Sequence, residues 1–126
     1  LLDYGCGAGD QYKRHRLHEK WNITDLFLYD PGVATRCARP DRKFDFVICS
    51  DVMEHVPREL VDNVLRDIFS FAEKHVWFSV CCRPAKKFFP DGRNLHLTLE
   101  SSEWWNERVS VAAGGVPGSF TLVFTQ

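Results

Sequence analysis

The residues with the clearest chemical potential stand at the start of the chain, where Asp3 precedes glycines at positions 5, 7 and 9. Alternate glycines let the backbone turn tightly and let a ligand approach it, because no Cβ atom stands in the way. A helix predicted to follow offers unpaired N–H groups and the positive end of its dipole. Dinucleotide-binding loops have a different spacing, Gly-x-Gly-x-x-Gly, and the Asp3 carboxylate would repel a pyrophosphate. The loop therefore favours a cationic or amino-bearing ligand.

Two further acids stand where apolar segments end. Asp30 closes the segment 26–30, one strand–helix–strand unit after the glycine loop. Asp51 follows the apolar segment 44–49. These three segments, in this order, resemble the cofactor-binding motifs of class I S-adenosylmethionine-dependent methyltransferases. The resemblance runs from residue 1 to about residue 82 and continues more loosely to the end of the chain.

The resemblance implies a methyltransferase that uses S-adenosylmethionine as its cofactor. In this family the acid that ends the second strand binds both ribose hydroxyls of the cofactor, and Asp30 takes that position. The residues expected to bind the cofactor belong to the three segments just described: Asp3, Gly5, Cys6, Gly7, Gly9, Tyr29, Asp30, Pro31, Ser50, Asp51 and Val52.

Methyl transfer from a sulfonium is an in-line displacement, so the protein mainly has to align the reactants and exclude water. A base is needed only when the nucleophile arrives protonated, as a hydroxyl does. Open α/β sheets bind ligands at the carboxyl ends of their strands, which draws attention to His55 after the segment 44–49 and to His96 after the segment 75–82. Both are catalytic candidates, with His96 as the favoured base. A purely structural role for His96 is the alternative.

A site without metal is the primary expectation, and a divalent ion is the alternative. The ubiquinone-pathway O-methyltransferases and the small-RNA 3′-terminal 2′-O-methyltransferases are metal-dependent branches with an acid-x-x-Glu-His segment at this point, and the latter add a later histidine. Asp51, Glu54, His55 and His96 match that pattern. Such ligands would hold an ion that activates an acceptor hydroxyl. In metal-free members the Glu-His pair instead caps the following helix.

Basic residues follow the predicted strand 75–82, at Arg83, Lys86, Lys87 and Arg93. Their position favours an acceptor that carries carboxylate or phosphate. Because no recognition domain is evident, a small molecule is the expected acceptor. One alternative is an RNA or nucleotide 2′-O-methyltransferase with a divalent metal, and another is a protein that binds S-adenosylmethionine without catalysis.

Alternating strand and helix patterns predict a Rossmann-like α/β sandwich of three layers with a mostly parallel sheet. The segment 44–49 is too apolar to face water on either side. The segments 109–113 and 119–125 flank a glycine-rich turn and predict a C-terminal antiparallel hairpin. Residues 31–43 are too few for a crossover helix, a strand and a return. The family's third strand is therefore expected to be missing, which leaves the order 2-1-4-5-7-6.

The composition bounds the remaining expectations. At 126 residues with 44% apolar and 26% charged residues, the chain is expected to be one domain, residues 1–126, that is either clipped at its N-terminus or minimal. A net charge of −1 argues against general nucleic-acid binding, and no apolar run is long enough for a membrane. Five cysteines without a C-x-x-C pair favour free thiols and a cytoplasmic location. The missing third strand would leave the strand 26–30 at an open edge, where self-association is expected.

Overall fold

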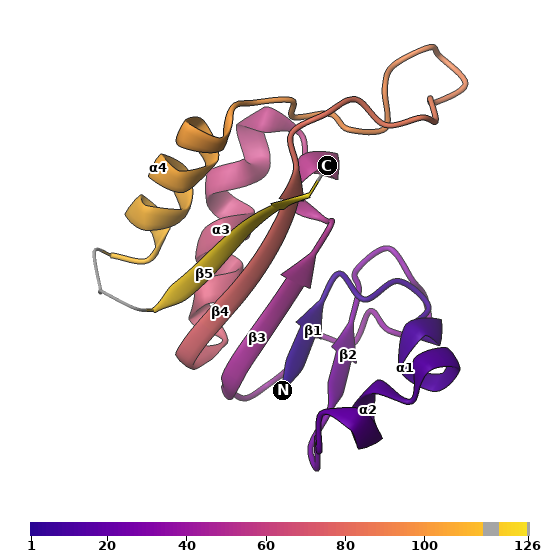
Figure 1. The fold of residues 1–126 in the computed structure, drawn as a ribbon, viewed down its shortest axis with the longest axis vertical. Coiled ribbons are helices and arrows are strands. Elements are labelled where there is room, and N and C mark those ends of the chain that lie inside the picture. Colours follow the sequence, from indigo (N-terminus) through magenta and orange to yellow (C-terminus); the bar gives the residue numbers. More distant parts are fainter. Residues whose placement is uncertain (115–118, 126) are drawn as a thin grey trace.

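The computed structural model describes residues 1–114 and 119–125. Its five strands are all parallel and form one sheet in the order β2-β1-β3-β4-β5 (Figure 1). The strands are β1 (Leu2–Tyr4), β2 (Phe27–Tyr29), β3 (Phe44–Ser50), β4 (Ala72–Cys81) and β5 (Phe120–Thr125). The helices are α1 (Asp10–His15), α2 (Leu17–Lys20), α3 (Val61–Ser70) and α4 (Ser102–Ala112), with short 3-10 turns η1 (Met53–His55) and η2 (Arg58–Leu60). The predicted α/β class and parallel sheet are confirmed.

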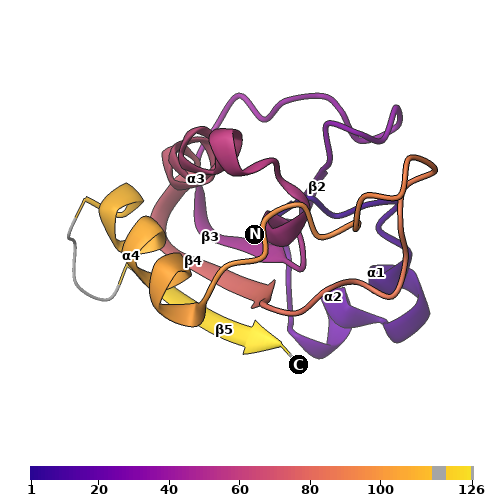
Figure 2. The same cartoon turned by 90° about the horizontal axis from the view of Figure 1, so that it is seen from above.

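The helices lie on both sides of the sheet. Figure 2 shows α3 and α4 together on one side, whereas α1 and α2 lie apart from them. In Figure 1, α1 and α2 lie next to β2. In α3, Val61, Leu65 and Ile68 recur at helical spacing and are buried against the sheet. Trp105 of α4 is also fully buried in this core. No helix in the described part of the chain is long and apolar enough to cross a bilayer.

The predicted C-terminal hairpin is wrong. Val109 belongs to α4, which runs on to Ala112, and β5 pairs with β4 in parallel register. The physical reason is the helical spacing of Trp105, Val109 and Ala112, which places these three side chains against the core. The segment expected to pair with β5 forms the end of α4. The six-strand order predicted from the sequence is therefore also wrong. The expected turn at 115–118 lies outside the described residues.

The connection from β2 to β3 forms turns and contains no strand, as its length predicted. The Asp30 N–H donates to the Arg36 carbonyl at 3.0 Å, which closes the first part of this connection on itself. As a result β2 is an edge strand of the sheet. Self-association through that edge stays a prediction.

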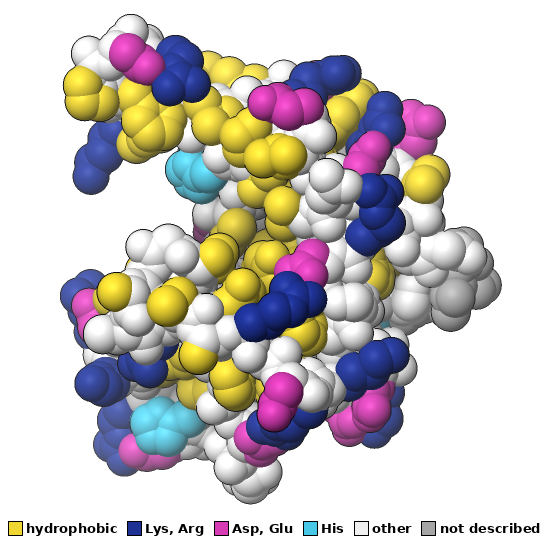
Figure 3. Space-filling view, turned by 180° about the vertical axis from the view of Figure 1, so that it is seen from behind, with side chains coloured by type: hydrophobic (Ala, Val, Ile, Leu, Met, Phe, Trp, Pro, Cys, Tyr) yellow, Lys and Arg dark blue, Asp and Glu magenta, His cyan; other side chains and the backbone are white. Residues whose placement is uncertain are grey.

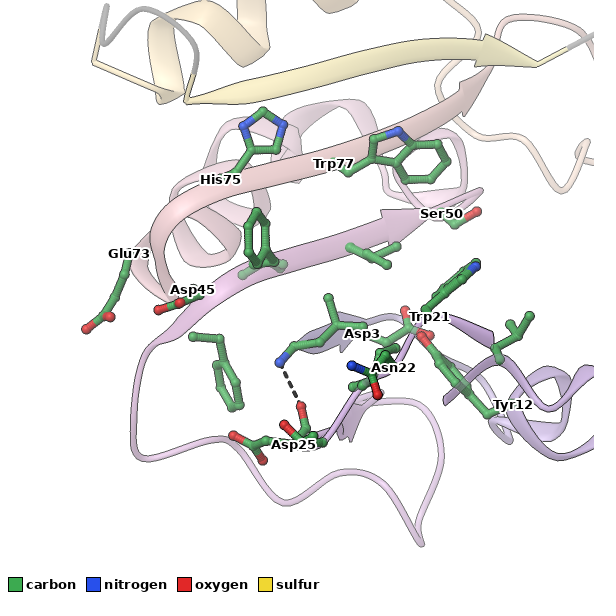
Figure 4. Close-up of a pocket in the computed structure, with 18 of the residues that line it drawn as sticks. Asp3, Tyr12, Trp21, Asn22, Asp25, Asp45, Ser50, Glu73, His75 and Trp77 are labelled. Carbon is green, nitrogen blue, oxygen red and sulfur yellow. Dashed lines mark hydrogen bonds between the residues drawn. The ribbon is translucent and has the colours of Figure 1, made fainter. Parts of the chain in front are cut away.

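One face of β3 is less covered than its apolar sequence suggested. Phe46 is 51% exposed, so the prediction that both faces of this strand avoid water is wrong. The short helices α1 and α2 cover only part of this face, and a hollow of about 1180 Å³ remains there. Figure 4 shows Trp21 and Trp77 at this hollow, with Asp25 and Asp45 toward one end.

Candidate cofactor and acceptor site

The glycine loop connects β1 to α1 with a backbone that L-amino acids with side chains rarely adopt. Its φ angles are 81° at Gly5, 57° at Gly7 and 74° at Gly9. The N–H groups of Gly5 and Cys6 both donate to the carbonyl of Tyr29, at 2.8 and 3.2 Å. The loop is thereby fastened to the end of β2.

The three glycines have different steric surroundings. A Cβ atom on Gly5 would lie 2.5 Å from Val52, and one on Gly9 would lie 2.7 Å from Leu28. A Cβ atom on Gly7 would meet nothing within 4 Å. Gly5 and Gly9 are therefore required for close packing, whereas Gly7 borders open space in which a ligand can approach the backbone.

The carboxylate of Asp30 joins this loop to the turn after β2. One oxygen accepts from the Gly7 N–H at 2.8 Å, and the other accepts from the Gly32 N–H at 2.8 Å. A carboxylate accepts about four hydrogen bonds, so each oxygen keeps a lone pair for a ligand hydroxyl.

A hollow of about 340 Å³ opens beside Asp30. Its lining contains five residues predicted to bind the cofactor and the catalytic candidate His55. Three further apolar or aromatic residues line it that were not predicted from the sequence to belong to a site. The lining residues are Tyr4, Gly5, Asp30, Pro31, Asp51, Val52, His55, Val56 and Val64. Val64 is a partly buried residue of the apolar stripe of α3, so its sequence context indicated only core packing.

The remaining predicted cofactor residues take other positions. Cys6 and Tyr29 are buried and support the loop through their backbone atoms. Asp3 and Ser50 line the larger hollow on the other face of the sheet. Gly5 of the glycine loop and Asp30 meet at the smaller hollow, which is therefore the candidate cofactor site and is here called the cofactor hollow.

Asp3 is 5% exposed, and the side chain of Gln11 donates to its carboxylate at 3.4 Å. Burial raises the pKa of Asp3 from 3.8 to about 6, and its hydrogen bonds only partly offset this effect. The buried carboxylate of Asp3 therefore depends on hydrogen bonds from the protein, such as the one from Gln11, and not on solvent.

Asp3→Asn is expected to change how stability depends on pH. Between pH 3.8 and about 6, the Asp3 carboxyl keeps its proton in the folded chain but loses it in the unfolded chain. This proton therefore stabilises the fold fully at low pH, and the stabilisation is lost as the pH rises through about 6. Relative to the native chain, Asp3→Asn should gain about 1.5 kcal/mol in free energy of unfolding between pH 5 and pH 8. Urea denaturation at the two pH values measures this, with exposed Asp41→Asn as the control. An equal pH response in Asp3→Asn and the native chain would contradict the raised pKa.

Asp51 connects the ends of three neighbouring strands. Its backbone has φ 53°, a left-handed conformation that is uncommon outside glycine. Its N–H donates to the Ser79 carbonyl at 3.0 Å, and its carboxylate accepts from the hydroxyls of Ser79 and Thr125, each at 3.2 Å. These contacts hold Asp51 at the wall of the cofactor hollow.

The two histidines predicted to be catalytic lie next to each other. Their rings meet edge to face, with centroids 4.8 Å apart and planes at 83°. Nδ1 of His55 lies 2.9 Å from the carbonyl of Leu95, and Nδ1 of His96 lies 2.5 Å from the carbonyl of Arg83. Each Nδ1 therefore donates, which leaves Nε2 of both rings with a free lone pair. His55 lines the hollow, whereas His96 does not.

The loop 83–98 carries the basic residues and projects beyond the end of the sheet (Figure 1). Asn94 joins the two ends of this loop: the Asn94 side chain accepts from the Ala85 N–H and donates to the Ala85 carbonyl, each at 2.9 Å. Phe88 on this loop is 61% exposed. Figure 3 shows a hollow between this projecting part and the body of the molecule, with Lys and Arg side chains on the projection.

Comparison with known proteins assigns the family. Residues 1–109 match the family model described as a methyltransferase domain. The chain belongs to this family. No curated protein and no solved structure matches it. The methyltransferase therefore uses S-adenosylmethionine as its methyl donor, as the resemblance of its motifs predicted.

The residues at the smaller hollow fit this cofactor. Asp30 retains acceptor capacity for ribose hydroxyls, and the open space at Gly7 permits close approach to the backbone. When bound, S-adenosylmethionine supplies an electrophilic methyl group on a sulfonium. The groups that would hold it are the glycine loop, the end of β2 and the turn after β3, which meet at this hollow.

Proposed function

We propose that this methyltransferase transfers the methyl group to a small acceptor that carries carboxylate or phosphate. The observation that carries the proposal is the loop 83–98, whose basic side chains Arg83, Lys86, Lys87 and Arg93 are all exposed. Arg93 pairs with Asp91 at 2.8 Å, whereas Lys86 and Lys87 have no ion pair within residues 1–114 and 119–125. Unpaired cations near the site attract an anionic acceptor and raise its rate of encounter.

In this proposal His55 accepts the proton of an acceptor hydroxyl. Its ring lines the cofactor hollow, and the Leu95 carbonyl holds Nδ1 as the donor, so Nε2 can take a proton. The acceptor oxygen, freed of its proton by His55, would be the nucleophile for the methyl group that bound S-adenosylmethionine would supply. His96, the base favoured by the sequence, packs edge to face against His55 and does not line the hollow.

The test is an assay with radiolabelled S-adenosylmethionine and paired acceptors, each a hydroxylated carboxylate or phosphate compared with its neutral ester. We expect the anionic member of a pair to be methylated. Changing Lys86 and Lys87 together to Gln should raise KM about tenfold and weaken its dependence on salt, with kcat unchanged. His55→Gln should instead lower kcat by about 100-fold or more.

The matched control is the double change of Lys13 and Lys20 to Gln, which removes the same charge from the exposed surface of α1 and α2. Equal KM increases in the two double variants would show a general charge effect and contradict an acceptor site on the loop. Methylation of RNA oligonucleotides, with no activity on the small acceptors, would favour the 2′-O-methyltransferase alternative. Cofactor binding without transfer to any acceptor would favour the non-catalytic alternative.

Two further features support proposals about context. All five cysteines are free thiols, which fits a reducing compartment such as the cytoplasm. The open edge of β2 offers unpaired backbone groups to a second copy of the chain, which supports self-association.

A further inference from the structure

Glu54 is buried, yet one of its two carboxylate oxygens accepts no hydrogen bond from a described residue. The side chain is 1% exposed, and one oxygen accepts from the Cys81 N–H at 3.0 Å. The other oxygen, Oε2, is buried without a hydrogen bond from any described residue. A buried acceptor in this state costs free energy, and a bound ion is one of the few features that would satisfy it.

Two metal-ligating side chains lie around this carboxylate. A carboxylate oxygen of Glu54, the thiol sulfur of Cys81 and a ring nitrogen of His96 all lie within 4.8 Å of one another. The three residues come from η1, from the end of β4 and from the loop 83–98. Ligand atoms around one zinc ion are about 3.5 Å apart, so these three atoms would have to move only a short distance toward one another to bind one ion.

Neighbouring backbone groups already orient two of the three ligands. The Arg83 carbonyl accepts from Nδ1 of His96 and leaves Nε2 as the ligand atom. The Cys81 N–H holds one oxygen of Glu54 and leaves the other available. Such second contacts, which fix the tautomer of a histidine and the direction of a carboxylate, are typical of metal sites.

We propose that Glu54, Cys81 and His96 bind a transition-metal ion of the zinc class. A set of one oxygen, one nitrogen and one sulfur ligand excludes magnesium and calcium, which take oxygen ligands, and suits zinc. Three protein ligands leave a fourth position for water or an acceptor oxygen. The ion would fasten the loop 83–98 to the end of β4, and it gives His96 a role other than proton acceptor.

This ligand set differs from the one that the sequence suggested as an alternative. Asp51 is not part of the group, and its carboxylate accepts from the hydroxyls of Ser79 and Thr125. His55 is not part of the group, and its Nδ1 is committed to the Leu95 carbonyl. In the proposed site Cys81 is the third ligand, in place of Asp51 and His55.

The inference is tested by adding zinc or cobalt(II) to metal-free protein. We expect about one zinc ion per chain after dialysis, and cobalt(II) should give a thiolate-to-metal charge-transfer absorption. Cys81→Ser and His96→Gln should each weaken zinc binding by more than about 100-fold, because even residues that only orient a metal ligand are worth about 10–100-fold. S-adenosylmethionine binding, measured by calorimetry, should persist in both variants and show that they are folded.

Cys82→Ser is the matched control, since Cys82 is the neighbouring free thiol outside the group. Zinc affinity should be unchanged in Cys82→Ser and in His55→Gln. Loss of zinc binding in either of these two variants would overturn the proposed ligand set. Absence of stoichiometric zinc binding in the native chain, or unchanged binding in Cys81→Ser, would overturn the site itself. Because these readouts do not use an acceptor, they are independent of the proposed function.

Discussion

Gly7→Val is expected to abolish S-adenosylmethionine binding while the domain stays folded. A Cβ atom at position 7 meets nothing within 4 Å, so the new side chain enters open space next to the contact between Gly7 and Asp30, where we expect the cofactor to lie. The φ angle of 57° adds backbone strain of roughly 1–2 kcal/mol for a residue with a side chain. Calorimetry should show affinity reduced by more than about 100-fold, which is about 3 kcal/mol. Thermal unfolding should remain cooperative at a lower midpoint.

The control for this substitution is Gly114→Val, just after α4. Gly114 also has a positive φ, 66°, and a Cβ atom there would likewise meet nothing within 4 Å. The backbone strain is therefore similar, but the position is remote in sequence from the glycine loop. Equal loss of binding in both variants would attribute the effect to stability, and normal binding in Gly7→Val would exclude the loop as the cofactor site.

Asp30→Asn is expected to weaken S-adenosylmethionine binding about 100-fold. The substitution keeps the size of the side chain but replaces two charged acceptor oxygens by one neutral oxygen and a donor. Hydrogen bonds to a charged group contribute about 1.5–3 kcal/mol each, so losing them at the ribose hydroxyls accounts for this effect. The same change removes one of the bonds from Gly7 and Gly32 that hold the loop.

Asp41→Asn is the matched control, because Asp41 is an exposed acid in the same connection between β2 and β3. Its cofactor affinity should equal that of the native chain. Circular dichroism should show that Asp30→Asn is folded. An unchanged affinity in Asp30→Asn would contradict the assignment of this carboxylate to the cofactor.

The meeting of Asp30 with the glycine loop was predictable because each part of this arrangement is local. A positive φ at Gly5, Gly7 and Gly9 is a property of a few adjacent backbone bonds, and glycine is the residue that adopts it at least cost. Asp30 ends an apolar strand, and the carboxyl ends of parallel strands gather at one edge of a sheet. Residue types and spacing therefore sufficed to bring Asp30 to the glycine loop.

The C-terminal region could not be decided in the same way. Residues 109–113 are apolar enough for a strand, and only contact with the core shows that Val109 continues the helical stripe of Trp105. Short apolar segments fit either structure, so the choice depends on the partner they pack against. Likewise, Phe46 is exposed because α1 and α2 cover only part of this face of the sheet.

The sequence by itself indicated the family, the cofactor and the positive-φ glycine loop, because these depend on spacings within single turns and strand ends. Tertiary structure alone brought Cys81 to Glu54 and His96. It also placed His55, and not His96, at the wall of the cofactor hollow. These contacts join residues far apart in the chain. Their geometry is set by strand register and by the path of the loop 83–98, which no local pattern of residues encodes.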